Sequence, residues 1–91
     1  MSVTVRVPAQ LRTLTGGVAE VSLEGSTVEE VLKALEVAHC GFTDRLFDDD
    51  GGLRRFVNLF LDDEDVRFLH ALSTPVTDGQ TLSIVPAVAG G

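Results

Sequence analysis

Two glycines, Gly90 and Gly91, end the sequence, and their type and position suggest chemistry at a terminal carboxylate. Glycine has no Cβ, so its backbone can enter a narrow channel and adopt dihedral angles that other residues avoid. A carboxylate is a poor electrophile and must first receive a good leaving group, for which the biological choice is an acyl adenylate made from ATP. We therefore expect Gly91 to be the substrate of an activating enzyme that uses ATP and Mg²⁺. The alternative is a frayed terminus without a role.

The residues before the diglycine predict a slim arm that enters the active site of that partner. Pro86 stiffens the base of the arm, which limits the entropy lost on docking. We expect residues 1–86 to form one small folded domain and residues 87–91 to form a flexible tail. The residues expected to enter the partner's active site are Pro86, Ala87, Val88, Ala89 and Gly90.

Two alternating segments near the N-terminus predict a β-hairpin. Residues 3–7 and residues 18–23 both alternate apolar and polar side chains, which is typical of strands with one buried face. In the second segment Val21 and Leu23 are expected to face inward. Residues 15–17 carry two glycines and offer turn chemistry, in a connection longer than a minimal two-residue loop.

A helix is predicted to begin at Ser26 or Thr27. Each hydroxyl has a glutamate three residues later, so either residue can cap the helix. Gly41 is a plausible stop for this helix. Apolar residues at helical spacing form one stripe along it: Val28, Val31, Leu32 and Leu35.

The region after the helix predicts one clear strand between polar segments. Residues 42–53 are expected to be irregular, and residues 56–61 form a strand of almost unbroken apolar character. Residues 62–65 are all acidic and indicate a polar turn. Residues 66–68 are expected to form a short strand or its remnant.

The last strand completes an α+β plan. Residues 77–80 indicate a turn, and residues 81–85 form a strand whose pairing is expected to end at Pro86, because proline has no N–H. A hairpin, one long helix and further strands predict a β-grasp (ubiquitin-like) fold, with a mixed sheet of four to five strands packed on one main helix. In that fold the first and last strands lie side by side in the middle of the sheet.

Strand alternation also predicts a surface for docking a partner. If the inward residues of strand 56–61 face the helix, Phe60 lies on the opposite face, and Val85 lies on that face of the last strand. An exposed apolar patch of Phe60 and Val85 near the root of the tail would be typical of an interface. Alternatively, the loop that carries Phe68, Leu69 and Leu72 folds over them as a satellite core.

Composition and charge narrow the classes of partner and site. The net charge of −7 disfavours nucleic acid and anionic membrane surfaces as partners. A single cysteine, Cys40, allows no disulfide within the chain, and we expect it to be a buried or semi-buried thiol in a cytoplasmic protein. No histidine or acidic spacing indicates a metal site. We expect no catalytic residues and no bound cofactor.

The sequence resembles the ThiS/MoaD family of ubiquitin-like sulfur carrier proteins over essentially its whole length. The segments that carry the resemblance are residues 56–61, residues 62–67 and residues 78–91, and the final strand, proline and diglycine are the most specific part. The strings FVN, DEDVRF and PAVAGG are similar to the CysO branch of the family, which serves cysteine biosynthesis.

The resemblance implies a mechanism in which partners supply the catalysis. An adenylating enzyme related to the ubiquitin-activating (E1) enzymes converts Gly91 to an acyl adenylate, and a sulfur donor replaces AMP to leave a thiocarboxylate. In the CysO branch a pyridoxal-phosphate synthase uses that sulfur on an aminoacrylate formed from O-phosphoserine. A zinc metalloprotease of the JAMM type then releases cysteine and restores the diglycine.

Three other functions stay open at this point. The same tail chemistry serves carriers for thiamin thiazole, for molybdopterin or for a thiolated secondary metabolite. A ubiquitin-like protein modifier would instead join Gly91 to a target lysine through an isopeptide bond. A β-grasp binding module would have an inert tail.

Overall fold

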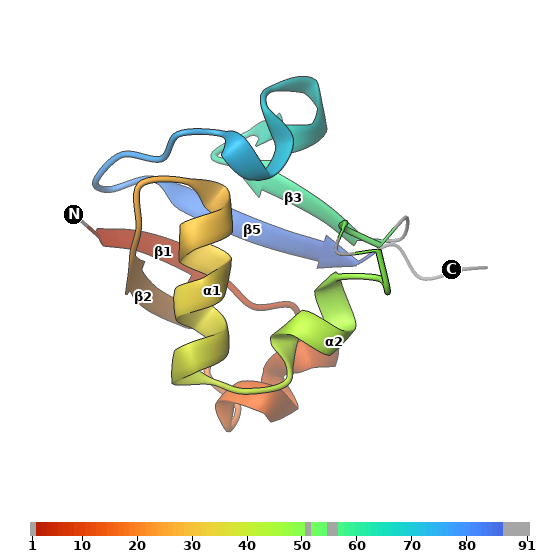
Figure 1. Ribbon diagram of the computed structural model, residues 1–91. Helices are drawn as coiled ribbons and strands as arrows, with labels where there is room; N and C mark the ends of the chain where they lie inside the picture. The colour runs from red at the N-terminus through yellow and green to blue at the C-terminus, as the bar shows by residue number, and fades with distance from the viewer. Residues whose placement is uncertain (1, 51, 55–56, 87–91) are drawn as a thin grey trace.

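The computed structural model describes residues 2–50, 52–54 and 57–86 of the 91-residue chain (Figure 1). Five strands form one mixed sheet in the order β2-β1-β5-β3-β4. The arrangement is the α+β, β-grasp plan predicted from the sequence. The strands are β1 (Ser2–Arg6), β2 (Glu20–Glu24), β3 (Val57–Leu61), β4 (Glu64–Asp65) and β5 (Thr81–Pro86). The helices are α1 (Val28–Ala38) and α2 (Phe42–Leu46), with 3₁₀ segments η1 (Ala9–Thr15), η2 (Val66–Phe68) and η3 (Ala71–Ser73).

The first and last strands lie side by side in the middle of the sheet, as predicted. β1 and β5 run parallel, with Thr4 opposite Thr81 and Arg6 opposite Ser83. β5 is also antiparallel to β3. β5 therefore holds the centre of the sheet, and strands on both sides fix its position (Figure 1).

The N-terminal hairpin is confirmed, but its connection is more ordered than the sequence indicated. β1 and β2 pair antiparallel from Ser2↔Glu24 to Arg6↔Glu20. The connection contains η1, which the alternation of its neighbours gave no reason to expect. Gly16 and Gly17 follow with φ angles of 68° and 96°, so the turn uses the backbone freedom of glycine.

Helix α1 begins as the sequence predicted, and the structure selects one of the two candidate caps. The Thr27 hydroxyl accepts a hydrogen bond from the Glu30 backbone N–H at 3.2 Å. The Glu30 carboxylate accepts one from the Ser26 N–H at 2.9 Å, which completes a reciprocal cap. The helix ends at Ala38, three residues before Gly41. The predicted apolar stripe is buried throughout: Val28, Val31, Leu32 and Leu35.

The prediction of an irregular segment over residues 42–53 is wrong at its start, where α2 forms one short helix. Phe42 and Leu46 bury one face of α2 in the core. The Glu36 carboxylate of α1 accepts hydrogen bonds from the backbone N–H groups of Gly41 (3.0 Å) and Thr43 (2.8 Å). These bonds favour the ionised carboxylate, first through Thr43 and then through Gly41, and lower the pKa of Glu36.

Glycine is required at the junction between α1 and α2. Gly41 has a φ angle of 110°, and a Cβ there would lie 2.9 Å from the Cδ2 atom of Leu14 in η1. The absence of a side chain lets η1 approach the junction. Gly41 thus starts α2 instead of capping α1, which corrects the predicted role of this residue.

The acidic segment after β3 is a turn only in its first half. Asp62 and Asp63 make the turn, whereas Glu64 and Asp65 pair with β3 as the short strand β4. Residues 66–68, predicted as a strand or its remnant, form the 3₁₀ turn η2. The Asp65 carboxylate accepts a hydrogen bond from the Arg67 N–H at 2.8 Å and thereby caps that turn. The predicted turn over residues 77–80 is confirmed.

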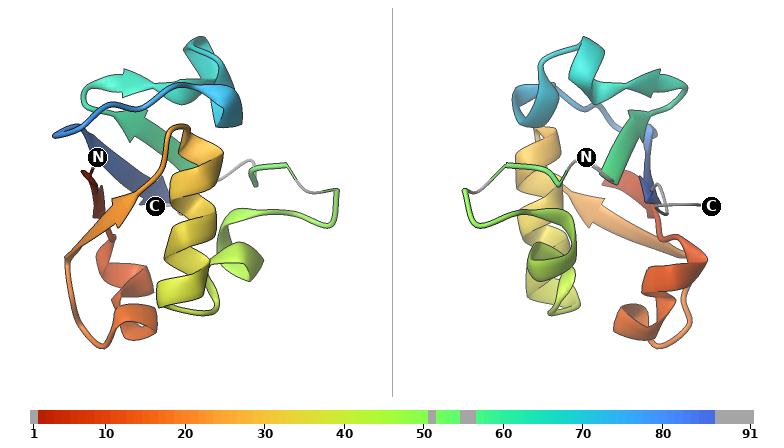
Figure 2. Two further views of the ribbon diagram at one scale, coloured as in Figure 1. Left: turned by 60° about the vertical axis from the view of Figure 1, so that its left-hand side comes forward. Right: turned by 90° about the vertical axis from the view of Figure 1, so that its right-hand side faces the viewer.

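Both α-helices pack on the same side of the sheet, and we call the sheet surface under them the inner face (Figure 2). Among the described residues, no helix has the length and apolar character that crossing a membrane requires. One core cluster joins the inner face, α1 and α2, and its buried members include Val3, Val5, Leu32, Leu35, Phe42, Leu59, Leu82 and Ile84. In α1 and the strands this core follows the periodicities of the sequence, whereas the core residues of α2 were not predicted.

Candidate functional site at the end of the central strand

The tail begins at the end of β5, the central strand of the sheet. β5 pairs with β3 from Leu82↔Leu61 to Pro86↔Val57, so Pro86 still belongs to the strand. The strand is thus one residue longer than the predicted 81–85, and its pairing ends at Pro86, which has no N–H to donate. The remaining residues assigned to the tail, Ala87 to Gly91, lie outside the described residues, and the role of Gly91 stays a prediction.

The outer face of the sheet, opposite the helices, brings the two predicted docking residues together. Val57, Leu59 and Leu61 are buried on the inner face, so Phe60 lies on the outer face and is half-buried. Val85 lies on the same face with an exposed fraction of 42%. Phe60 pairs with Ser83, which makes Val85 its diagonal neighbour, about 7–8 Å away. We name Phe60 and Val85 the outer patch.

The alternative interpretation, in which the loop that carries Phe68, Leu69 and Leu72 folds over the outer patch, does not hold for Phe68 and Leu72. Phe68 is 88% exposed and covers nothing. Leu72 packs against the core on the helix side and lines a small cavity of about 210 Å³ with Leu32 and Phe47. The outer patch is therefore not the base of a satellite core formed by Phe68 and Leu72.

An arginine that the sequence analysis did not single out fixes the strand beside the tail. The Arg67 guanidinium donates hydrogen bonds to the Val57 carbonyl at 2.7 Å, to the Arg54 carbonyl at 3.0 Å and to the Asn58 side chain. Because Val57 pairs with Pro86, these bonds hold the start of β3 where β5 ends. The acceptors are 9 to 13 positions away in the sequence, so no local pattern indicated this contact.

The side chains that bear reactive groups elsewhere do not assemble into a site. Cys40 is exposed, which corrects the expectation of a buried or semi-buried thiol. Within residues 2–50, 52–54 and 57–86, no cluster of three or more histidine, cysteine or acidic side chains is arranged to hold a metal ion. The described part of the site is thus the outer patch beside the end of β5.

Residues 5–91 match the ThiS family. The sulfur carrier protein CysO of Mycobacterium tuberculosis (strain ATCC 25618 / H37Rv) is 47% identical over 93 residues, which cover 100% of both proteins. A chain in the crystal structure of the Amycolatopsis orientalis BexX/CysO complex is 48% identical with a TM-score of 0.91, covering 98% of this chain and 99% of that one. The crystal structure of SAMP1 from Haloferax volcanii is 30% identical with a TM-score of 0.84 and covers 100% of both chains.

Proposed function

The chain belongs to the ThiS family, and on that premise we propose that it is a sulfur carrier and not itself an enzyme. The observation that carries the proposal is the place of β5: the strand that leads to the tail is the central strand, fixed on both sides. A rigid base lets a partner enzyme bind the folded body and find the start of the tail at a constant position. The likeness to CysO over the full length of both proteins supports the same role.

The proposed cycle begins with activation of the Gly91 carboxylate. Its oxygen attacks the α-phosphorus of ATP in the active site of an adenylating (E1-like) enzyme, and pyrophosphate leaves. Mg²⁺ and basic groups of that partner neutralise the developing charge. A sulfide-level donor then attacks the acyl carbon, AMP leaves, and Gly91 carries a thiocarboxylate.

We propose cysteine biosynthesis as the pathway that receives the sulfur. The thiocarboxylate sulfur adds to the β-carbon of an aminoacrylate, which a pyridoxal-phosphate synthase forms from O-phosphoserine. An acyl shift from sulfur to nitrogen gives a carrier–cysteine amide. Hydrolysis by a zinc metalloprotease of the JAMM type releases cysteine and restores Gly91. The resemblance to the CysO branch supports this choice over thiamin thiazole, molybdopterin or a secondary metabolite.

We propose that the outer patch docks these partners. Its two residues lie near the end of β5, so a partner bound there also faces the root of the tail. The remaining candidate of another class, a protein modifier, is favoured by the match to SAMP1, because a small archaeal modifier protein shares the fold at 30% identity.

Intact mass of the chain purified from its host cells tests the carrier role. The wild type is expected to show a fraction about 16 Da heavier, since sulfur replaces one oxygen of the terminal carboxylate. A variant that lacks Gly91 should never gain this mass, whereas the control Val37→Ala, at a position 85% exposed on α1, should load normally. Loading of the truncated variant would exclude the proposal. High-mass conjugates joined through Gly91 would favour the modifier instead.

Identification of the captured partner tests the pathway separately. Wild-type chain is immobilised, exposed to host lysate, and the retained proteins are identified by mass spectrometry. A synthase that contains pyridoxal phosphate is the expected result. A thiazole synthase or a molybdopterin synthase subunit in its place would reassign the pathway and leave the carrier role intact.

A further inference from the structure

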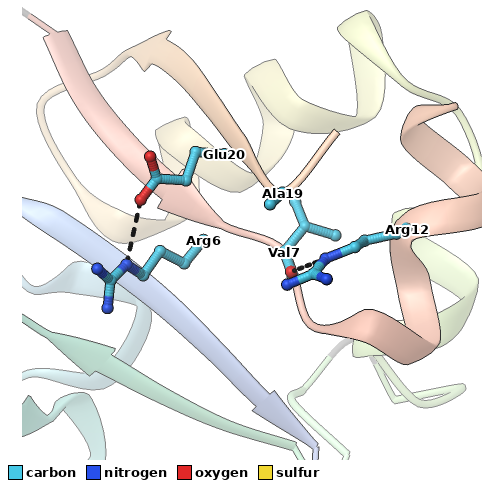
Figure 3. A pocket seen from close by; sticks show the side chains of 5 residues that line it. All are labelled: Arg6, Val7, Arg12, Ala19 and Glu20. Carbon is cyan, nitrogen blue, oxygen red and sulfur yellow. Dashed lines mark hydrogen bonds and ion pairs between the residues drawn. The ribbon is translucent and has the colours of Figure 1, made fainter. Parts of the chain in front are cut away.

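A depression lies at the end of β1, beside the outer face of the sheet. It has a volume of about 350 Å³ and is lined by Arg6, Val7, Arg12, Ala19 and Glu20. Figure 3 shows Arg12 reaching back from η1 toward Val7, and Arg6 extending from β1 beside Glu20 in the direction away from Arg12; both arginines line the depression. Neither arginine is used by the contacts that hold the tail root.

Each of the two arginines is anchored through its own Nε atom. The Arg6 Nε lies 3.2 Å from the Glu20 carboxylate, and the Arg12 Nε donates a hydrogen bond to the Val7 carbonyl at 3.2 Å (Figure 3). Their terminal nitrogens make no hydrogen bond to another residue that the structure describes. Each guanidinium thus has its orientation fixed and keeps its outer pair of N–H donors available. That pair fits the two oxygens of a carboxylate.

The charge of the depression is opposite to that of the chain. Two guanidinium groups face one carboxylate there, whereas the whole chain has a net charge of −7. A local positive site on an acidic protein attracts an anionic group. Exposure of the Arg6 side chain (65%) means that the attraction stays weak until a partner excludes water.

The depression is continuous with the proposed docking surface. Arg6 lies opposite Ser83 of β5, and Ser83 lies opposite Phe60 of β3, so the three residues form one row across the outer face. With neighbouring strands about 4.8 Å apart, the backbones of Arg6 and Phe60 are about 10 Å apart. A partner seated on the outer patch therefore also reaches Arg6.

We propose that this depression receives an aspartate or glutamate side chain of the enzyme that activates Gly91. The inference rests on the proposed function and adds the chemistry of recognition: an apolar contact at the outer patch and a carboxylate in the depression that Arg6 and Arg12 line. Seating of the partner on the patch removes water from the depression and strengthens the charge-assisted hydrogen bonds. The open shape favours a side chain presented by a protein surface over a free anion, because the depression alone does not enclose a ligand.

Saturation kinetics of the activating enzyme test the proposal. The probe is the adenylating enzyme isolated from host lysate on immobilised wild-type chain, assayed by ATP–pyrophosphate exchange. The variants are Arg6→Gln, Arg12→Gln and the pair together, which remove charge at nearly constant size. The matched control is Lys33→Gln, which removes a cation from α1 on the opposite side of the sheet. Thermal unfolding of each variant confirms that the fold is kept.

Each single variant is expected to raise the half-saturating concentration of the carrier about tenfold, and the pair to raise it further. The maximal rate and the KM for ATP should stay unchanged. Added salt should raise the half-saturating concentration of the wild-type chain by a larger factor than that of the double variant. Lys33→Gln should behave as wild type.

The proposal would be overturned if the double variant saturated the activating enzyme at the same concentration as the wild-type chain. A raised KM for ATP in the variants would also overturn it, because the occupant would then be a nucleotide phosphate. Absence of exchange with the wild-type chain itself would instead refute the proposed function on which the inference rests.

Discussion

The two faces of strand β5 differ in how much of their side chains is exposed to solvent. On the inner face Leu82 and Ile84 are 0% and 3% exposed and pack in the core. On the outer face Val85 is 42% exposed, and Ser83 separates Arg6 from Phe60. One strand therefore belongs to the core through one set of residues and to the proposed docking surface through the residues between them.

This contrast teaches that stability and recognition can be changed independently along a single strand. An inner substitution should unfold the protein before any effect on partners is seen. A substitution on the outer face should keep the fold and affect only the binding of partners. The four predictions below are ordered by their expected effect on the free energy of unfolding.

Leu82→Ala should give the largest loss of stability. The side chain is fully buried at the centre of the sheet, so its removal leaves a cavity and lowers the free energy of unfolding by about 2–5 kcal/mol. Urea denaturation measures the loss, with Val37→Ala as an exposed control. A loss of less than about 1 kcal/mol would mean that the inner face is not the main source of stability.

Arg67→Ala should give an intermediate loss. The substitution removes three hydrogen bonds at the start of β3 and should cost about 1–3 kcal/mol. Arg67→Lys keeps the charge but lacks the planar fork, so it should recover only part of the loss. Full recovery by lysine would show that charge, and not the hydrogen-bond geometry, stabilises this end of the sheet.

Glu36→Gln should lower the melting temperature slightly, and only at pH values where the wild-type carboxylate is ionised. The pKa of Glu36 is lowered from its ordinary value of 4.5 by hydrogen bonds from Thr43 and Gly41. A lowered folded-state pKa stabilises the protein above the unfolded-state pKa, and this contribution is lost as pH falls through the folded-state pKa. The gap between variant and wild type in thermal unfolding should therefore be present at neutral pH and close in acid. A gap independent of pH would contradict the capping role.

Val85→Asp should change stability least and sulfur loading strongly. An exposed site tolerates the substitution within about 0.5 kcal/mol, while a charge in the outer patch should reduce thiocarboxylate formation at least tenfold if the patch docks the activating enzyme. Phe60→Asp should reduce loading in the same way. Normal loading of both variants would remove the docking role from the outer patch, and a loss of stability equal to that of Leu82→Ala would place Val85 in the core.

The sequence predicted those parts of the fold that depend on local periodicity. The apolar stripe of α1, the alternation of β3 and the central pairing of the first and last strands all agree with the structure. Capping was predicted as a choice between two hydroxyls, because both Ser26 and Thr27 have a glutamate three residues later. Backbone geometry decided for Thr27.

Features held together by distant contacts could not be predicted in the same way. Helix α2 has only five residues, and its start depends on the Glu36 carboxylate of the preceding helix. Arg67 donates hydrogen bonds to the carbonyls of Val57 in β3 and of Arg54, and Arg6 and Arg12 line one depression because η1 turns the chain back. The outer patch could be predicted because alternation alone assigns Phe60 and Val85 to one face, whereas the arginines beside it required the fold.

The central place of β5 also has a consequence for how the protein is made. β5 follows every other element in the chain, yet β1 and β3 are neighbours of β5 and not of each other. During synthesis the sheet cannot be completed until β5 has left the ribosome, because β5 alone connects the N-terminal hairpin to the β3–β4 pair. Closing such a long-range contact is the slow step expected of this topology. Under the proposed function, the activating enzyme therefore meets the outer patch and the start of the tail together only after β5 has joined the sheet.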